Sequence, residues 1–351
     1  MTLQGLPGIA SAVIRPAPSR LPPSVASPAS AYPASISFAL ALAAFAVLVA
    51  ISGLAASATA APSAARGARG PFPVTVTDAF GREVTVSGPP ERIVTVFSSN
   101  TELVASLGLT DLIVGIDAMT FYPPEIATVK KIGGRLGISL EQVASVRPDL
   151  VILTPARQAA HTLLGPLDLL GVPTAVLTSR DVEEIEGNIL KIASLCGVPM
   201  RGEALVGFME RRLDRVRLAR RGLPRPRTVI LTSRLSTGLF LASRKGEYTS
   251  QLVELAGGVL ALDEGGAFPR VPQISPEALI GLDPDVIIVT RRRDEGTELR
   301  DYLDSPAFAS LTARRTGQIH VVPSAEYLIP ADRVVDGVER LAEIFTTWGR
   351  Q

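Results

Sequence analysis

The hydrophobic positions of the chain follow two alternating patterns. Unbroken apolar runs stand at residues 92–97 (RIVTVF), 112–117 (LIVGID) and 149–154 (DLVILT), each of a length suited to a buried strand. Between them, residues 101–108 (TELVASLG) and 140–148 (LEQVASVRP) space their apolar side chains as a helix does. Buried strands that alternate with helices predict a parallel sheet covered by helices, which is an α/β fold.

The same alternation recurs in the second half of the chain. Strands are predicted at 227–233 (RTVILTS), 238–242 (GLFLA), 259–263 (VLALD), 285–290 (DVIIVT) and 318–323 (QIHVVP), with a closing helix at 331–348. Between the halves, residues 201–221 carry apolar side chains at helical spacing with arginines opposite, and at about 1.5 Å per residue they form a helix of roughly 30 Å. We therefore predict two Rossmann-like lobes (71–198 and 224–351), each with a central parallel sheet, joined by one long rigid helix (199–223).

Local signals add three details to this outline. Residues 74–86 (VTVTDAFGREVTV) alternate like a hairpin whose turn is at 80–82. Ser98, Ser99 or Asn100 is expected to cap the helix that ends at Gly108. A further helix is expected from Val182 to Cys196.

Residues 1–70 do not follow either pattern. Residues 1–35 contain no Asp or Glu, residues 36–54 are a continuous apolar run, and small residues then alternate up to an A-x-A site near Ala60. This is typical of a secretory signal peptide followed by a flexible lead-in, which predicts a periplasmic protein. The alternative is an uncleaved N-terminal helix that anchors the protein, since about 20 apolar residues span a bilayer.

One phrase is written twice in the chain. Across residues 138–154 and 274–290, seven of 17 positions are identical, including Glu141 with Glu277 and the dipeptides Pro148-Asp149 and Pro284-Asp285. The repeat indicates that the two lobes arose by duplication. For the Pro-Asp pairs we favour a structural role, ending a helix and opening the next strand.

Composition excludes several functions. The formal net charge is +1 with basic residues among acidic ones, so nucleic acid is not an expected partner. With one cysteine and two histidines in the whole chain, a cysteine-ligated cluster or a three-histidine metal site cannot be assembled. We find no G-x-S-x-G, phosphate loop or paired carboxylates in a cleft loop, so we predict no enzyme activity, catalytic residue, resident metal or cofactor.

Several motifs occur together in a specific order. They are DAFGREV, RIVTVFSSNTELVASLG, YPPE at 122–125, the repeated phrase, LVELAGG at 252–258 and IPADRVVDGVERLAEI at 329–344. Over about residues 74–345 the chain resembles the helix-linked periplasmic substrate-binding proteins that deliver cobalamin, ferric siderophores or haem to ABC importers. The resemblance implies a monomer that holds a small-molecule metal chelate in a cleft between its lobes and docks on an ABC permease dimer with its ATPase.

The resemblance also implies roles for particular residues. In that family each lobe presents one acidic residue to the permease, and the matching positions are Glu141 and Glu277. Two equivalent permease halves require two equivalent carboxylates, one per lobe. The alternative is that each Glu merely occupies the first turn of a helix, where the helix dipole favours it by less than about 1 kcal/mol.

Ligand contacts are expected from the loops at the carboxyl ends of the strands. Tyr122 matches a family position where an aromatic ring flanks cobalamin, Asn100 lies in the FSSNT loop, and Tyr248 could reach the cleft from the second lobe. These three residues are predicted to contact the ligand.

Two arginines distinguish this chain from the corrinoid-binding relatives. Arg135 stands where such a relative carries tryptophan, and Phe268 and Arg270 flank the corresponding place in the second lobe. Guanidinium groups pair with carboxylate or catecholate oxygens, which favours an anionic ferric siderophore over a corrinoid.

Other ligands and functions remain open. Haem is an alternative ligand, although the GGRLG loop (133–137) lacks the tyrosine that haem-binding relatives use. A receptor for a bare metal ion, a membrane-anchored sensory or scaffold module, and a nitrogenase-like enzyme are alternatives with related lobes.

Overall fold

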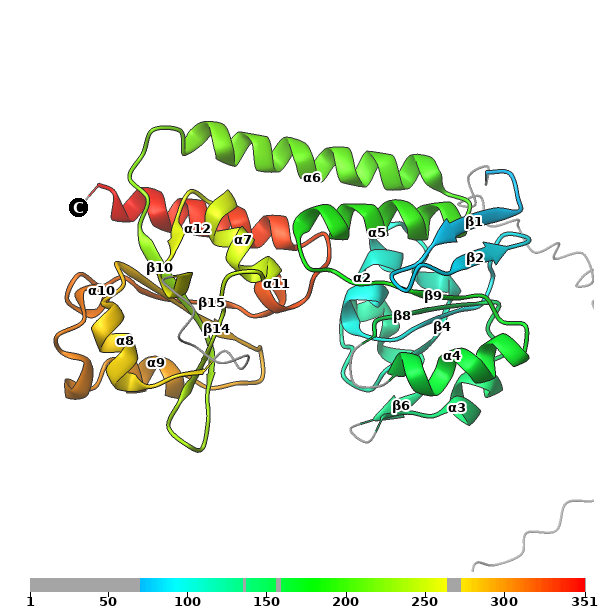
Figure 1. The fold of residues 1–351 in the computed structure, drawn as a ribbon, viewed down its shortest axis with the longest axis horizontal. Coiled ribbons are helices and arrows are strands. Elements are labelled where there is room, and N and C mark those ends of the chain that lie inside the picture. The colour runs from blue at the N-terminus through cyan, green and yellow to red at the C-terminus, as the bar shows by residue number, and fades with distance from the viewer. Residues whose placement is uncertain (1–69, 135–136, 156–158, 264–272, 351) are drawn as a thin grey trace, which may run out of the picture. The chain divides into compact units, whose positions relative to one another are not determined.

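The computed structural model describes residues 70–134, 137–155, 159–263 and 273–350 (Figure 1). The N-terminal lobe comprises β1 (Val74–Thr77), β2 (Glu83–Val86), β3 (Ile93–Thr95), α2 (Ser98–Ser106), η1 (Thr110–Leu112), β4 (Ile113–Ile116), η2 (Pro124–Thr128), β5 (Lys130–Lys131), β6 (Gly133–Gly134), β7 (Gly137–Ile138), α3 (Leu140–Ser145), β8 (Leu150–Leu153), α4 (Ala159–Leu169), β9 (Thr174–Val176) and α5 (Val182–Leu195). The linking helix is α6 (Pro199–Ala219). The C-terminal lobe comprises β10 (Arg227–Arg234), β11 (Phe240–Ala242), α7 (Tyr248–Leu255), β12 (Val259–Leu260), η4 (Ala261–Asp263), β13 (Gln273–Ile274), α8 (Pro276–Leu282), β14 (Val286–Arg291), α9 (Glu298–Leu303), η5 (Pro306–Phe308), α10 (Thr312–Arg315), β15 (Ile319–Pro323), α11 (Ala325–Leu328) and α12 (Val334–Trp348).

The N-terminal lobe is built on a parallel sheet with the strand order β5-β4-β3-β8-β9. Its central strands β3 and β8 are buried along their whole length, as expected for a sheet covered on both faces. The hairpin is confirmed, since β1 pairs antiparallel with β2 from Val74 opposite Val86 to Thr77 opposite Glu83. Gly81 in its turn has φ +74°, a conformation that favours glycine.

The C-terminal lobe has the predicted central parallel sheet, which two antiparallel strands extend at one edge. Strands β12, β10, β14 and β15 run parallel, whereas β11 pairs antiparallel with both β10 and β13. Residues 235–239 between β10 and β11 are too few for a parallel connection, which needs a dozen or more residues. The predicted strand at 259–263 is also shorter, because it turns into the 3₁₀ helix η4 after Leu260.

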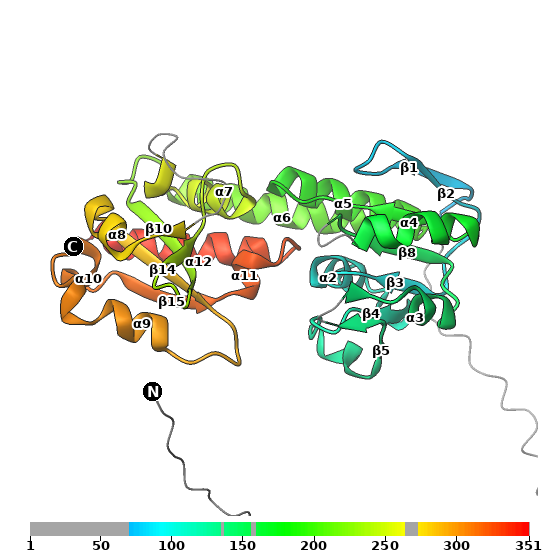
Figure 2. The same cartoon turned by 60° about the horizontal axis from the view of Figure 1, so that its bottom comes forward.

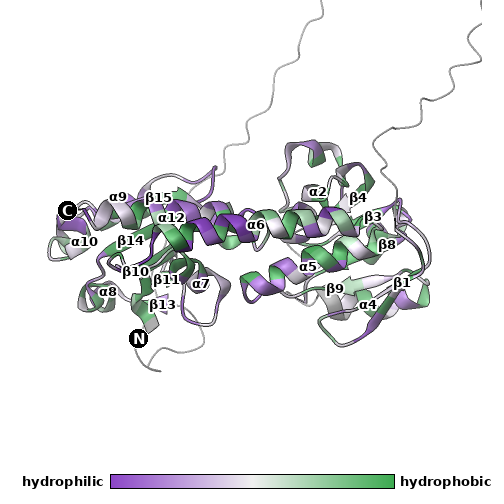
Figure 3. Cartoon of the chain, turned by 90° about the horizontal axis from the view of Figure 1, so that it is seen from above, coloured by the Kyte–Doolittle hydropathy of each residue, from purple (hydrophilic) through white to green (hydrophobic). Residues whose placement is uncertain are grey.

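Helix α6 has the predicted length of 21 residues, starting at Pro199 two positions before the predicted start. It packs on α5 of the N-terminal lobe and on α12 and α7 of the C-terminal lobe (Figures 1 and 2). The contact with α5 is close at Gly202, where an added Cβ would lie 2.6 Å from the Cβ of Ala193. Figure 3 shows that the end of α6 nearest the C-terminal lobe is strongly hydrophilic, in keeping with its arginines.

The apolar core explains why α6 connects the lobes firmly. A single cluster of buried side chains includes residues of both lobes together with Val206, Met209, Leu213 and Val216 from the buried face of α6. The linking helix therefore contributes to the core along most of its length. Within the described ranges, no helix is both long enough and apolar enough to cross a lipid bilayer.

Candidate functional site

The loops at the carboxyl ends of β3 and β4 are held together by Asp117. Its carboxylate accepts hydrogen bonds from the backbone N–H groups of Phe97 (2.9 Å) and Met119 (2.8 Å) and from the hydroxyl of Thr120 (2.6 Å). Phe97 precedes α2 with φ +79° and offers no side-chain cap, so the prediction that Ser98, Ser99 or Asn100 caps this helix was wrong. The orienting role of Asp117 was not foreseen from the sequence.

The loop after β4 presents large apolar side chains to solvent. Met119, Phe121 and Tyr122 are 53%, 74% and 45% exposed, respectively. The ammonium group of Lys131 donates to the backbone carbonyl of Thr120 (2.8 Å) and lies 5.6 Å from the ring centroid of Phe121. Adjacent exposed apolar side chains on an anchored loop are typical of a binding surface.

Tyr122 belongs to a cluster that joins the two lobes. The guanidinium group of Arg333, just before α12, lies 3.9 Å from the Tyr122 ring centroid and donates to both carboxylate oxygens of Glu102 on α2 (2.8 and 2.6 Å). Beside this pair, the Ser106 hydroxyl donates to Asp332 (2.9 Å). We call Tyr122, Glu102 and Arg333 the junction cluster.

The electrostatics of the junction cluster follow from its burial. The side chain of Glu102 is 1% exposed and that of Arg333 is 21% exposed. Burial raises the pKa of Glu102, and the hydrogen bonds from Arg333 oppose that rise. Glu102 and Arg333 were missed from the sequence, although a glutamate on the apolar face of residues 101–107 was a signal that it needs a buried partner.

Asn100 is a buried residue whose side chain bonds to other parts of the N-terminal lobe. It is 2% exposed, and its side-chain amide donates to the carbonyl of Val96 (2.7 Å) and the hydroxyl of Thr154 (3.1 Å). These bonds tie α2 to the ends of β3 and β8. We therefore leave Asn100 out of the ligand contacts proposed below.

A cavity of about 420 Å³ lies between residues of both lobes. We call it the junction cavity, and Tyr248 is among its lining residues, as are Ser179 and Arg180 of the N-terminal lobe. The C-terminal lobe supplies the rest of its wall from β10, β11, the loop before α7, and α11. Burial, together with the charges of Glu247 and Glu102, raises the pKa of the Tyr248 phenol, so this side chain stays neutral at physiological pH.

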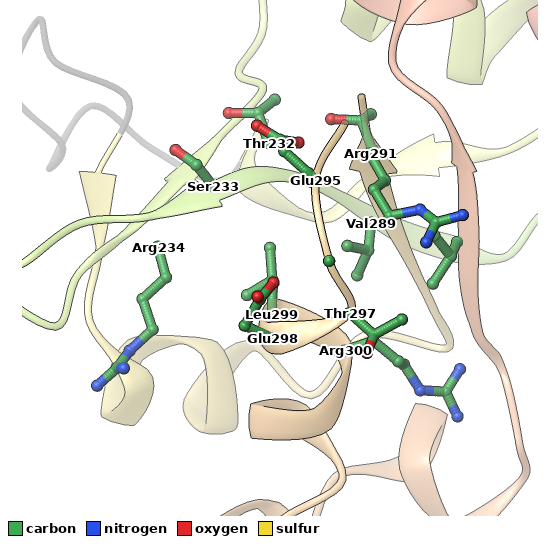
Figure 4. Close-up of a pocket in the computed structure, with 13 residues that line it drawn as sticks. Thr232, Ser233, Arg234, Val289, Arg291, Glu295, Thr297, Glu298, Leu299 and Arg300 are labelled. Carbon is green, nitrogen blue, oxygen red and sulfur yellow. The ribbon is translucent and has the colours of Figure 1, made fainter. Parts of the chain in front are cut away.

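A second cavity, of about 220 Å³, opens where β10 and β14 end (Figure 4). In Figure 4 the carboxylate of Glu298 lies near the middle of the view and that of Glu295 lies above it near Thr232, and the guanidinium groups of Arg234 and Arg300 point away from both. Protein partners hold both arginines: Arg234 lies 3.9 Å from the Tyr302 ring centroid, and Arg300 donates to Asp304 (2.7 Å). We call this the sheet-end cavity.

Glu141 and Glu277 occupy equivalent, exposed positions in the two lobes. Each is the second residue of a short helix whose serine cap accepts a backbone hydrogen bond: Ser139 from Gln142 in α3, and Ser275 from Ala278 in α8. A hydrogen bond from the capping serine lowers the pKa of each glutamate, so both are charged at neutral pH. In Figure 1 the rest of its own lobe separates each of these helices from α6.

The repeated Pro-Asp pairs have the structural role that the sequence predicts. Asp149 accepts from the backbone N–H of Arg92 (2.9 Å) at the start of β3, and Asp285 accepts from that of Arg227 (2.8 Å) at the start of β10. Each of these arginines in turn donates from its side chain to carbonyl groups at the end of the repeated helix. The duplication therefore preserved a junction between strand, helix and strand.

The remaining predicted residues are placed as follows. Arg135, Phe268 and Arg270 lie outside the described residues, as does the predicted signal segment, and their roles stay predictions. Tyr327 is fully buried and donates to the carbonyl of Gly337 (3.1 Å). His320 is half-buried in β15 beside Gln318 (2.9 Å).

Comparison with known proteins settles the family. The profile of the family described as "Periplasmic binding protein" matches residues 93–326, which is more than half of the chain. The chain belongs to the periplasmic binding protein family. This agrees with the two lobes and the linking helix described above.

Members of the periplasmic binding protein family with similar sequences include transporter components. The chain is 27% identical over 278 residues to the ABC transporter substrate-binding lipoprotein YvrC of Bacillus subtilis, covering 78% of this chain and 85% of the relative. It is 28% identical over 283 residues to a cobalamin-binding protein of Halobacterium salinarum, covering 78% and 74%, respectively.

Solved structures of the periplasmic binding protein family share the fold. The heme-binding protein RhuT from Roseiflexus matches with a TM-score of 0.63 and 27% identity, covering 75% of this chain and all of that one. The vitamin B12-binding protein BtuF of Vibrio cholerae matches with a TM-score of 0.65 at 23% identity, covering 75% of this chain and 99% of that one. At that identity the second likeness shows the fold alone.

Proposed function

We propose that this chain is the substrate-binding component of an ABC importer for a metal chelate, which is either a ferric siderophore or a corrinoid. The relatives named above include an ABC transporter substrate-binding lipoprotein, a cobalamin-binding protein and a heme-binding protein, which supports a role in binding and transport. In this proposal the protein works as a monomer outside the cytoplasmic membrane. It is either released after cleavage near Ala60 or held by the uncleaved apolar segment.

The single observation that carries the proposal is the matched presentation of Glu141 and Glu277. Both are exposed, both are charged at neutral pH, and both stand at the second position of a serine-capped helix in duplicated surroundings. A role in helix stability alone would be met by an acidic residue anywhere in the first turn. Docking on a permease with two equivalent halves requires one glutamate at the same position of the repeated helix in each lobe.

Ligand contact is proposed for the surfaces at the lobe junction. The apolar loop with Met119, Phe121 and Tyr122 offers area for the face of a macrocycle or chelate, and the junction cavity with Tyr248 offers space for its edge. Exposed aromatic side chains bury large areas at low entropic cost, which suits capture of a rigid ligand. Arg135, Phe268 and Arg270 are retained as proposed contacts.

The docking proposal is tested by charge reversal. Glu141→Lys with Glu277→Lys is expected to abolish chelate uptake by cells that carry the cognate permease, while equilibrium affinity for the chelate changes less than about 2-fold. The control is Glu125→Lys with Glu254→Lys, which changes the same charge at one exposed position in each lobe and should leave uptake intact. A collapse of ligand affinity in the first variant would move these glutamates from the permease interface to the ligand site.

A further inference from the structure

We propose that the outward face of α6 is a membrane-contact surface, which binds the anionic phospholipids of a bilayer. This inference goes beyond the proposed function, because it concerns where the exported protein is held between deliveries and not which chelate it carries. The outward face is the set of α6 residues that point away from the core: Met200, Phe208, Arg211, Arg215 and Leu218.

The outward face lies opposite the buried face of α6. Successive residues of an α-helix are turned by about 100°, so residues 200, 208, 211, 215 and 218 fall within about 80° of one another around the axis. The buried residues of α6 lie on the other side of the helix: Gly202, Val206, Met209, Leu213 and Val216. Met200, Phe208 and Leu218 are 72%, 48% and 70% exposed. Large apolar side chains are therefore held in water along the linking helix.

Arginines are concentrated at the C-terminal end of the outward face. Residues 211–225 contain seven arginines and a single acidic residue, Asp214. Three of these arginines are used within the protein: Arg212 pairs with two carboxylates of α12, Arg217 pairs with Asp214, and Arg220 is buried. Four arginines remain for contacts outside the protein.

These four arginines have little or no compensating negative charge. Arg211, Arg221 and Arg225 form no ion pair with another residue of the described ranges, and Arg215 approaches a glutamate of α12 only to 4.0 Å. All four are exposed, as is Leu223, which follows the helix. Figure 3 looks onto this face of α6 and shows its hydrophilic end beside the C-terminal lobe. Unmatched positive charge beside exposed apolar side chains complements an anionic bilayer, because apolar insertion and charge attraction both contribute to binding there.

The spacing of the apolar side chains favours a bilayer over a protein partner. At about 1.5 Å per residue, Met200, Phe208 and Leu218 are about 12 and 15 Å apart along the axis, and Arg211 and Arg215 lie between the last two. A stable interface with a second copy or with another protein has an apolar centre that is depleted of charged residues. At a bilayer surface, apolar side chains insert separately while guanidinium groups bind phosphate oxygens.

The point where the chain enters the described fold supports the same surface. The backbone N–H of Gly70 donates to the carbonyl of Gly197 (2.8 Å), and a Cβ added at Gly70 would lie 3.5 Å from Pro199, the first residue of α6. The apolar run ends at Leu54, 16 positions before Gly70, so an uncleaved anchor would hold this end of α6 within about 55 Å of the bilayer. The arginines lie at the other end of α6, so the two contacts together would lay the helix along the membrane.

This orientation excludes permease docking at the same moment. In Figure 1 the rest of each lobe separates α6 from α3 and α8, which carry the proposed docking residues Glu141 and Glu277. Contact through the outward face therefore turns both glutamates away from the bilayer. Membrane contact holds the protein close to its permease, and delivery requires the protein to leave the lipid surface and turn over.

The test is co-sedimentation of the exported chain, from Ala61 onward, with lipid vesicles. One set of vesicles is phosphatidylcholine alone, and the other is equal parts of phosphatidylcholine and phosphatidylglycerol. We expect wild type to bind the second set far more tightly and to lose binding at high salt. Arg211→Gln with Arg215→Gln should weaken binding roughly 25-fold, because each arginine near an anionic surface contributes about 5-fold. Leu218→Ser should weaken it roughly 5-fold by removing apolar area from the membrane interface.

Two matched variants separate charge on this face from charge in general. Arg293→Gln with Arg315→Gln removes the same charge from exposed positions outside α6 and should bind as wild type does. Arg211→Lys with Arg215→Lys keeps the charge and should retain most of the binding. Equal binding of wild type to both sets of vesicles, or equal weakening by the two glutamine pairs, would overturn the inference.

Two further measurements distinguish the other outcomes. Sedimentation velocity without lipid should show a monomer, and a wild-type dimer that Leu218→Ser dissociates would assign the outward face to a second copy and overturn the inference. Affinity for cyanocobalamin and ferrioxamine B tests the proposed function separately and should be the same in all these variants. A wild type that binds either chelate but no vesicle overturns the membrane contact alone, whereas one that binds anionic vesicles but neither chelate supports the membrane contact and counts against the proposed function.

Discussion

The ion pair between Arg333 and Glu102 allows a quantitative prediction. Its hydrogen bonds measure 2.8 and 2.6 Å, and the pair of Arg340 with Glu326 has the same two-pronged geometry at 2.8 and 3.0 Å. The two pairs differ in burial, because the glutamate side chains are 1% and 12% exposed and the arginine side chains 21% and 44%. Geometry is therefore held nearly constant while solvation changes.

Replacing the arginine of either pair leaves the glutamate carboxylate without its ion-pair partner, and the loss in stability depends on how well water can solvate it. Arg333→Ala leaves a buried carboxylate, and the usual cost of breaking such a pair is about 3–5 kcal/mol, so we expect a loss of about 3 kcal/mol in the free energy of unfolding. Arg340→Ala leaves a carboxylate that water reaches more easily, and we expect a loss of about 1 kcal/mol. The double variant Arg333→Ala with Glu102→Gln should recover a large part of the first loss, because no buried charge remains.

Urea unfolding at two pH values measures these quantities. In Arg333→Ala the unpaired Glu102 carboxyl has its pKa raised further by burial, so it takes up a proton on acidification and the destabilisation should be smaller at pH 5 than at pH 8. Equal losses for Arg333→Ala and Arg340→Ala, or a loss that does not depend on pH, would refute the view that Glu102 is a buried charge held by Arg333.

Two further predictions concern α5 and α6. Burial and the nearby carboxylates raise the pKa of Glu186 to about 7. The neutral carboxyl, which favours the folded state, is fully present below pH 4.5 and is lost as the pH rises through 7. Glu186→Gln should therefore stabilise the protein at pH 8 by roughly 1–2 kcal/mol and hardly at all at pH 4.5, as measured by thermal unfolding. Gly202→Ala would place a Cβ 2.6 Å from that of Ala193 and should lower the free energy of unfolding by about 1–3 kcal/mol. Gly207→Ala is the control, because its Cβ would meet only a flexible side chain of the same helix at 3.2 Å, and it should be neutral or stabilising. Equal effects of the two variants would show that α5 and α6 are not closely packed at Gly202.

The order of elements could be predicted from the sequence because local rules determine it. Buried strands such as residues 150–153 are continuous apolar runs, and α6 shows the helical period over its whole length, so both were predicted within about two residues. Strand direction in the C-terminal lobe was harder, because β11 and β13 are short and their pairing depends on which edge of the sheet is free. The helix cap at Phe97 was missed because its conformation is set by Asp117, 20 residues away.

The candidate site divides in the same way. Tyr122 and Tyr248 were proposed as ligand contacts because they lie in loops that follow strands, and Glu141 and Glu277 were proposed as docking residues because the repeat contains both; these roles stay predictions. Glu102 and Arg333 are 231 positions apart, and no sequence motif around either residue predicts that they form an ion pair. Asn100 was predicted at the ligand because it follows a strand, whereas the direction of its side chain depends on its hydrogen bonds with Val96 and Thr154.

By itself, the sequence determined the α/β class, the two lobes, the linking helix and the equivalent acidic positions. Hydrophobic periodicity and internal repeats depend only on the order of residues along the chain. Tertiary structure decided which charges are already matched and which side chains stay exposed. Those properties depend on contacts between residues such as Glu102 and Arg333 that only folding brings together. A side chain is available to a ligand only if the folded protein does not already bury or pair its polar groups. The sequence alone does not show this, because the partners are brought together by folding.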